Sequence, residues 1–169
     1  MDKNKDKKVA KMIYSDLITC IGKVNQNFFN FNNNNFDETF EITSIILFCI
    51  LNGMKNRSEQ KYKKLNQDLM DIFINDLDYS FRNLGIGDMS IGKYTKKYVK
   101  KFYYRLSKLD VIFSDNDFNK FYNYLIVHKL VSQNINSKML NKLFEDLNML
   151  IFRAKNNNEF SLLYRDLFN

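Results

Sequence analysis

The sequence predicts an all-α fold, a single-domain bundle of six or seven helices across residues 1–169. Three observations carry this prediction. Every long segment repeats its apolar residues at steps of three and four, and the alternating period of a strand is nearly absent. The chain has no proline, so its helices can run without interruption. Hydrophobic residues make up 45% of the 169 residues, which is enough to bury a core within one domain.

Three helices are expected in the first half of the chain. Residues 6–24 are amphipathic, and the Asn-rich segment 25–36 after them is expected to be a loop, because Asn favours turns and caps. Residues 38–52 are apolar on nearly every side, as expected of a central buried helix, and Gly53 is its expected stop. Residues 58–84 form the longest expected helix.

The second half is expected to add four more helices. The amphipathic pattern places them at 90–112, 115–133 and 137–155, with a short final helix at 158–168.

Cysteine, histidine and hydropathy patterns exclude several classes of protein. Cys20 and Cys49 both lie in apolar stretches, which predicts two buried thiols in a reducing compartment. The lone His128 cannot complete a zinc site with them, so no metal or other cofactor is expected. The longest apolar run, 45–51, is far shorter than the about 20 residues of a membrane-spanning helix, and no secretory signal is visible. We expect a cytoplasmic protein that can contact the inner face of the plasma membrane peripherally.

Three glycines lie close together after the longest helix, and they suggest a corner between two helices. Gly85, Gly87 and Gly92 do not have the spacing of a phosphate-binding loop, and they follow a helix where such a loop follows a strand. Gly85 is expected to adopt the left-handed conformation that ends a helix. Asp88 or Ser90 is expected to cap the next helix.

The helix after this corner has one basic and one apolar face. The basic face comprises Lys93, Lys96, Lys97, Lys100, Lys101 and Arg105. The apolar face comprises Ile91, Tyr98, Phe102, Leu106 and Leu109. No acidic residue lies between Asp88 and Asp110, and the whole chain carries a formal charge of +7. The basic face is either a solvated surface or a docking surface for a negatively charged partner, and we expect the six cations to be exposed together.

Acidic residues of the preceding helix allow a second set of predictions. Asp76 lies near the apolar arc, so it should be at least half buried and bonded to the corner or to the next helix. Asp68, Asp71 and Asp78 share a face, as in Mg²⁺-dependent all-α enzymes of the isoprenoid type. The second Asp-rich helix that such sites require is absent, so an exposed acidic face, shared with Arg82, is expected instead. A di-iron bundle needs Glu-x-x-His twice, and the chain has one His. We therefore expect no catalytic residues and no enzyme.

The residues of the corner resemble a known family. The stretch Asp-Leu-Asp-Tyr-Ser-Phe-Arg-Asn-Leu-Gly-Ile-Gly-Asp-Met-Ser-Ile-Gly-Lys at 76–93, followed by Phe-Tyr-x-Arg at 102–105, resembles the ubiquinol–cytochrome c chaperone family. The matching positions are Asp76, Arg82, Gly85, Gly87, Asp88, Lys93, Phe102 and Tyr103. The resemblance extends over about 36–106, including an upstream block at 36–41. Tyr104 departs from it, because many relatives have Gly there.

The resemblance implies a non-enzymatic assembly factor of respiratory complex III. Such proteins bind newly made cytochrome b together with a small partner protein, near the ribosome and the inner membrane. The lack of a mitochondrial presequence suggests a bacterial member. The alternative is a basic helical protein that binds nucleic acid or the ribosome, with 65–109 as a helix-turn-helix. Its second helix carries mainly lysines, which favour phosphates over base edges, so sequence-specific binding is not expected.

Overall fold

The computed structural model describes residues 3–29, 35–55, 57–131 and 136–169. Within these ranges the α-helices are α1 (Lys3–Val24), α2 (Phe36–Lys55), α3 (Gln60–Asn83), α4 (Asp88–Ser114), α5 (Phe118–Val127) and α6 (Ser137–Asn156). No strand occurs in these ranges. The structure therefore confirms an all-α single-domain bundle.

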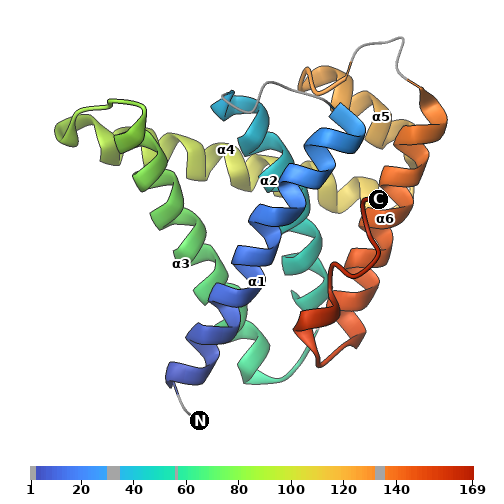
Figure 1. Cartoon of the computed structure of the whole chain (residues 1–169), viewed down its shortest axis with the longest axis horizontal. Coiled ribbons are helices and arrows are strands. Elements are labelled where there is room, and N and C mark those ends of the chain that lie inside the picture. Colours follow the sequence, from blue (N-terminus) through green and yellow to red (C-terminus); the bar gives the residue numbers. More distant parts are fainter. Residues whose placement is uncertain (1–2, 30–34, 56, 132–135) are drawn as a thin grey trace.

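Helix α2 forms the centre of the bundle because it is apolar on nearly every side. Residues 40–50 are all buried, as the sequence predicted. Helices α1, α3, α4 and α6 all pack against α2. Figure 1 shows α4 crossing behind α2, with the α3–α4 corner projecting at one end of the molecule. This arrangement brings the first turns of α2 against the middle of α4.

Gly53 does not end α2, contrary to the sequence prediction, because the helix continues to Lys55. A Cβ atom at Gly53 would lie 2.5 Å from Cβ of Ala154 and 2.6 Å from the carbonyl oxygen of Ile151. Glycine is therefore needed for the close approach of α2 and α6 and not for a turn.

Other boundaries also differ from the prediction. Asn25–Phe29, expected as loop, continues α1 as a π-helical turn, and the next five residues of the expected loop lie outside the described ranges. Helix α5 spans only Phe118–Val127 instead of 115–133. It ends early because Lys129 adopts a φ of 58°. The final helix expected at 158–168 is reduced to a 3₁₀ turn, Phe160–Leu162.

The corner between α3 and α4 confirms the prediction for Gly85, whose φ is 79°. Its N–H donates to the carbonyl oxygen of Arg82 at 3.0 Å, and the N–H of Ile86 donates to that of Phe81 at 3.1 Å. These two bonds form a Schellman motif, which satisfies the last carbonyls of α3. The expected cap by Asp88 or Ser90 is wrong. Gly87 is the N-cap of α4, with no side-chain hydrogen bond.

Candidate functional site

The six cations expected on one exposed face of α4 divide into two groups. Lys93, Lys96, Lys97 and Lys100 are exposed, and we call them the lysine stripe. The side chain of Lys101 is 28% exposed, and Arg105 is buried at 8%. The expectation of common exposure is therefore wrong for Lys101 and Arg105, because their positions on α4 turn toward α2.

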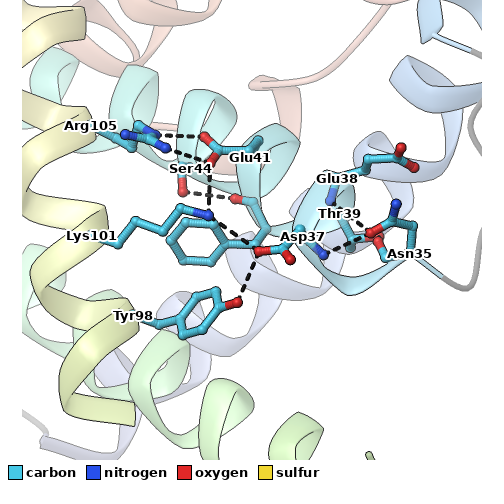
Figure 2. Close-up of polar contacts among 10 residues, drawn as sticks. Asn35, Asp37, Glu38, Thr39, Glu41, Ser44, Tyr98, Lys101 and Arg105 are labelled. Atoms are coloured by element: carbon cyan, nitrogen blue, oxygen red, sulfur yellow. Dashed lines mark hydrogen bonds and ion pairs between the residues drawn. The ribbon is translucent and has the colours of Figure 1, made fainter. Parts of the chain in front are cut away.

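Arg105 is buried because it forms a two-pronged ion pair with Glu41 of α2. Its Nε donates to Oε2 of Glu41 at 2.7 Å and its Nη2 donates to Oε1 at 2.8 Å. Nζ of Lys101 lies 3.0 Å from the same Oε1 (Figure 2). Burial alone would raise the pKa of Glu41, but the hydrogen bonds from Arg105 and Lys101 outweigh it and hold this pKa below its ordinary value. The carboxylate is thus ionised and fully paired.

The network extends to the first turn of α2 through Asp37. The Tyr98 hydroxyl donates to Oδ1 of Asp37 at 2.9 Å, and Nζ of Lys101 donates to the same oxygen at 3.2 Å. Burial, followed by the bond to Asp37, raises the pKa of Tyr98 to about 12. Asn35 caps α2, since its Oδ1 accepts from the Asp37 N–H at 3.1 Å (Figure 2). We call Asp37, Glu41, Tyr98, Lys101 and Arg105 the polar cluster. It fixes the start of α2 to the middle of α4.

Aromatic side chains surround the polar cluster. Nζ of Lys101 lies 4.8 Å from the centroid of the Phe40 ring and 5.2 Å from that of Tyr98, within the range of cation–π attraction. Phe102 is fully buried and packs on Phe73 with ring centroids 4.7 Å apart. Within the cluster only Glu41 and Arg105 are buried, so the strengthening of charge–charge attraction by low-dielectric surroundings applies to that pair.

On the α5 side, Tyr124 lies near the cluster and borders a hollow in the surface. Its ring centroid lies 4.4 Å from that of His128, and its buried hydroxyl has no hydrogen-bond partner within the described residues. Burial, then the charge of Glu41, raises the pKa of Tyr124. A hollow of about 380 Å³ lies here, lined in part by Tyr104 and Val127.

Asp76 is partly buried, as predicted, but its expected partner is wrong. The Tyr14 hydroxyl of α1 donates to Oδ2 of Asp76 at 2.9 Å, so the carboxylate binds neither the corner nor α4. Asp76 thus joins α3 to α1.

The expected acidic face of α3 is only partly exposed. Asp68 is 4% exposed and pairs with Lys64, whereas Asp71 is exposed. Asp78 is partly buried and bonds to Arg82 at 3.2 Å. Across the corner, Arg82 also pairs with Asp88. Within the described part of the chain, no three His, Cys, Asp or Glu side chains are grouped to hold a metal ion.

A groove between α2, α3 and α4 offers an apolar surface to a partner. Its volume is about 500 Å³, within the range of ligand-binding clefts. Its apolar lining comprises Phe48, Leu51, Met70, Tyr103 and Leu106. Its polar lining comprises Asn52, Lys55, Lys63, Asn66, Gln67, Ser107 and Asp110. Asn66 is among the lining residues, and its Oδ1 is buried without a hydrogen-bond partner in the described ranges.

Comparison with known families decides where the chain belongs. The sequence profile described as ubiquinol–cytochrome C chaperone matches residues 31–125, more than half of the chain. The chain belongs to the ubiquinol–cytochrome c chaperone family. Membership is consistent with a role in the assembly of complex III and implies a client protein. No curated protein sequence matches the chain significantly.

A solved structure shares the fold of this chaperone-family protein. The crystal structure of the Cbp3 homolog from Brucella abortus is similar, with a TM-score of 0.75 at 21% identity. The similarity covers 98% of this chain and 91% of that one. No described helix of the chaperone-family protein is both long and apolar enough to cross a bilayer.

The structure brings together some of the family-motif residues and separates others. Arg82, Gly85, Gly87 and Asp88 lie at the α3–α4 corner, and Lys93 lies on the second turn of α4. Phe102 lies in the core, and Tyr103 lines the groove at 56% exposure.

Sequence reasoning missed Glu41 and Asp37, the acidic half of the polar cluster. A usable signal existed for Glu41, because a carboxylate within the apolar run of α2 needs a buried cationic partner.

Proposed function

We propose that this protein is a non-enzymatic assembly factor that binds newly made cytochrome b and supports the assembly of ubiquinol–cytochrome c reductase. The observation that carries the proposal is the family match over residues 31–125, which include α2, α3, α4 and most of α5. These helices form both the polar cluster and the groove. A chaperone of this family needs a surface for its client, and the groove has suitable chemistry.

We place an apolar helix of cytochrome b in the groove. Met70 gives the groove a flexible apolar side chain that can adapt to a client which has not reached its final fold. Polar side chains such as Asn52, Gln67 and Ser107 line the groove together with the apolar ones, so it can contact both apolar and polar parts of a client. The polar cluster supports the site by fixing α4, which supplies one wall of the groove, against α2.

The proposal is tested by co-purification of cytochrome b from membranes of cells that express a tagged protein. Tyr103→Ala removes an exposed aromatic side chain of the groove and should reduce the recovered cytochrome b about ten-fold or more, because interface tyrosines often contribute 2 kcal/mol or more. Tyr104→Ala is the matched control. Tyr104 is 54% exposed, close to the 56% of Tyr103, but it lines the hollow toward α5.

Two results would contradict the proposal. Cells that lack the protein could assemble complex III at the normal level, which would exclude the assembly role. Equal recovery of cytochrome b with both variants would leave a role in assembly but exclude the groove as the client site.

A further inference from the structure

The lysine stripe is a charged surface that the fold itself does not use. Met89, Lys93, Lys96 and Lys100 follow one another at steps of four and three, so they form one line along α4, and all four are exposed. No carboxylate in the described part of the chain forms an ion pair with a lysine of the stripe. A lysine row without internal partners is complementary to a negatively charged surface.

Exposed apolar side chains lie at the end of this line, on the α3–α4 corner. Met89 is fully exposed at 103%, and Leu84 is 56% exposed. Arg82 at the corner pairs with both Asp78 and Asp88, so these three charges are paired with one another. Figure 1 shows the corner projecting beyond the other helices at one end of the long axis, where a flat surface can reach it.

We propose that the lysine stripe and the corner form a docking surface for an anionic lipid bilayer. In this arrangement the lysines lie at the level of the lipid phosphates, while Met89 and Leu84 reach the boundary between the headgroups and the acyl chains. One weak apolar anchor combined with a basic patch gives reversible peripheral binding.

A bilayer explains this surface better than nucleic acid does. Lysines can bind the phosphates of either partner, but exposed aliphatic side chains gain free energy only where they leave water. Met89 and Leu84 would stay hydrated beside an RNA backbone, whereas a bilayer interface would bury them. The surface also lacks an exposed unpaired arginine, the side chain that most often reads bases. This inference goes beyond the proposed function, because it concerns where the protein binds and not which client it holds.

Vesicle sedimentation of the full chain tests the proposal. The wild type should bind vesicles of phosphatidylglycerol mixed with phosphatidylcholine and not vesicles of phosphatidylcholine alone. The triple variant Lys93→Gln, Lys96→Gln, Lys100→Gln should bind about a hundred-fold more weakly, since each lysine near an anionic membrane contributes about five-fold. Leu84→Gln with Met89→Gln should weaken binding about ten-fold. Added salt should weaken the binding of the wild type.

A control variant with the same change of net charge tests whether vesicle binding depends on this surface or only on the charge of the whole protein. Lys7, Lys8 and Lys11 are exposed on α1, and their replacement by Gln should leave vesicle binding nearly unchanged. An equal loss in this control would overturn the proposal. So would equal binding of the wild type to both kinds of vesicle, or binding of an RNA oligonucleotide through the stripe without vesicle binding. Because no cytochrome b is present in the assay, failure here leaves the proposed function untouched.

Discussion

Two adjacent lysines of the lysine-rich run on α4 behave in opposite ways, although the residues are alike. Lys100 is exposed and forms no ion pair within the described ranges, whereas Lys101 contacts both Asp37 and Glu41. Successive side chains of an α-helix point in directions about 100° apart. That rotation turns Lys100 toward solvent and Lys101 toward α2. A cluster of like charges in a sequence is therefore not one surface, because the neighbouring helix decides which of its members become structural.

The largest expected effect comes from removing the buried carboxylate of Glu41, which binds both Lys101 and Arg105. Glu41→Ala should destabilise the fold by about 3–5 kcal/mol, because Arg105 would be left buried with its charge unpaired. Urea unfolding followed by circular dichroism measures the change. In the double variant Glu41→Leu, Arg105→Leu, neither charge remains, so it should lose less than Glu41→Ala. A loss below about 1 kcal/mol for Glu41→Ala would show that Arg105 finds water or another partner.

A pH titration sharpens the same contrast. Burial alone would raise the pKa of Glu41, but the bonds from Arg105 and Lys101 lower it in the folded state. The contribution of ionised Glu41 to stability is therefore complete above the pKa of a Glu in the unfolded chain, about 4.3. It is lost as the pH falls through the lower pKa of Glu41 in the folded state. Unfolding free energies measured between neutral pH and this region should decline for the wild type. The decline should be shallower for the double leucine variant.

The adjacent lysines should differ in a direct comparison. Lys101→Gln should cost about 1 kcal/mol, because it removes contacts to two carboxylates from a side chain that is only 28% exposed. Lys100→Gln should change stability by no more than about 0.5 kcal/mol. Both variants change the net charge equally, so their unfolding midpoints can be compared directly. Equal midpoints would mean that Lys100 and Lys101 contribute equally to stability.

The last expected effect is a gain in stability on the exposed side of α4. A Cβ at Gly92 would meet no atom within 4 Å, and Gly92 lies inside the helix without a positive φ. Gly92→Ala should therefore stabilise the fold by up to about 1 kcal/mol, because alanine favours the helix over glycine. Thermal unfolding of the variant and the wild type shows whether the change raises or lowers stability. A lower melting temperature would reveal a constraint on the backbone of this turn.

Local patterns predicted the helices of this fold and its main corner. The left-handed conformation of Gly85 follows from a helix that ends where glycine is available, and the burial of α2 follows from its apolar run. The place of Arg105 could also have been predicted. At 100° per residue, Arg105 lies on the side of α4 opposite to Lys96, nine residues earlier. The sequence prediction placed all six cations on one exposed face and so did not distinguish Arg105 from the lysine stripe.

Contacts between distant segments could not be predicted in the same way. The bond from Tyr14 to Asp76 depends on how α1 lies along α3, and no local signal specifies that pairing. The same holds for Gly53, whose close contact with Ala154 depends on the approach of α2 and α6. The groove likewise requires the relative placement of three helices.

The two buried thiols make the chain its own reporter of internal motion. Burial raises the pKa of Cys20 to about 12 and that of the fully buried Cys49 well above its ordinary value. The thiolate is the reactive form, so an alkylating reagent can modify either residue only after the helices separate. Cys20 is on the peripheral helix α1 and Cys49 on the central helix α2. Their separate labelling rates would therefore distinguish detachment of α1 from opening of the whole molecule, without any engineered probe.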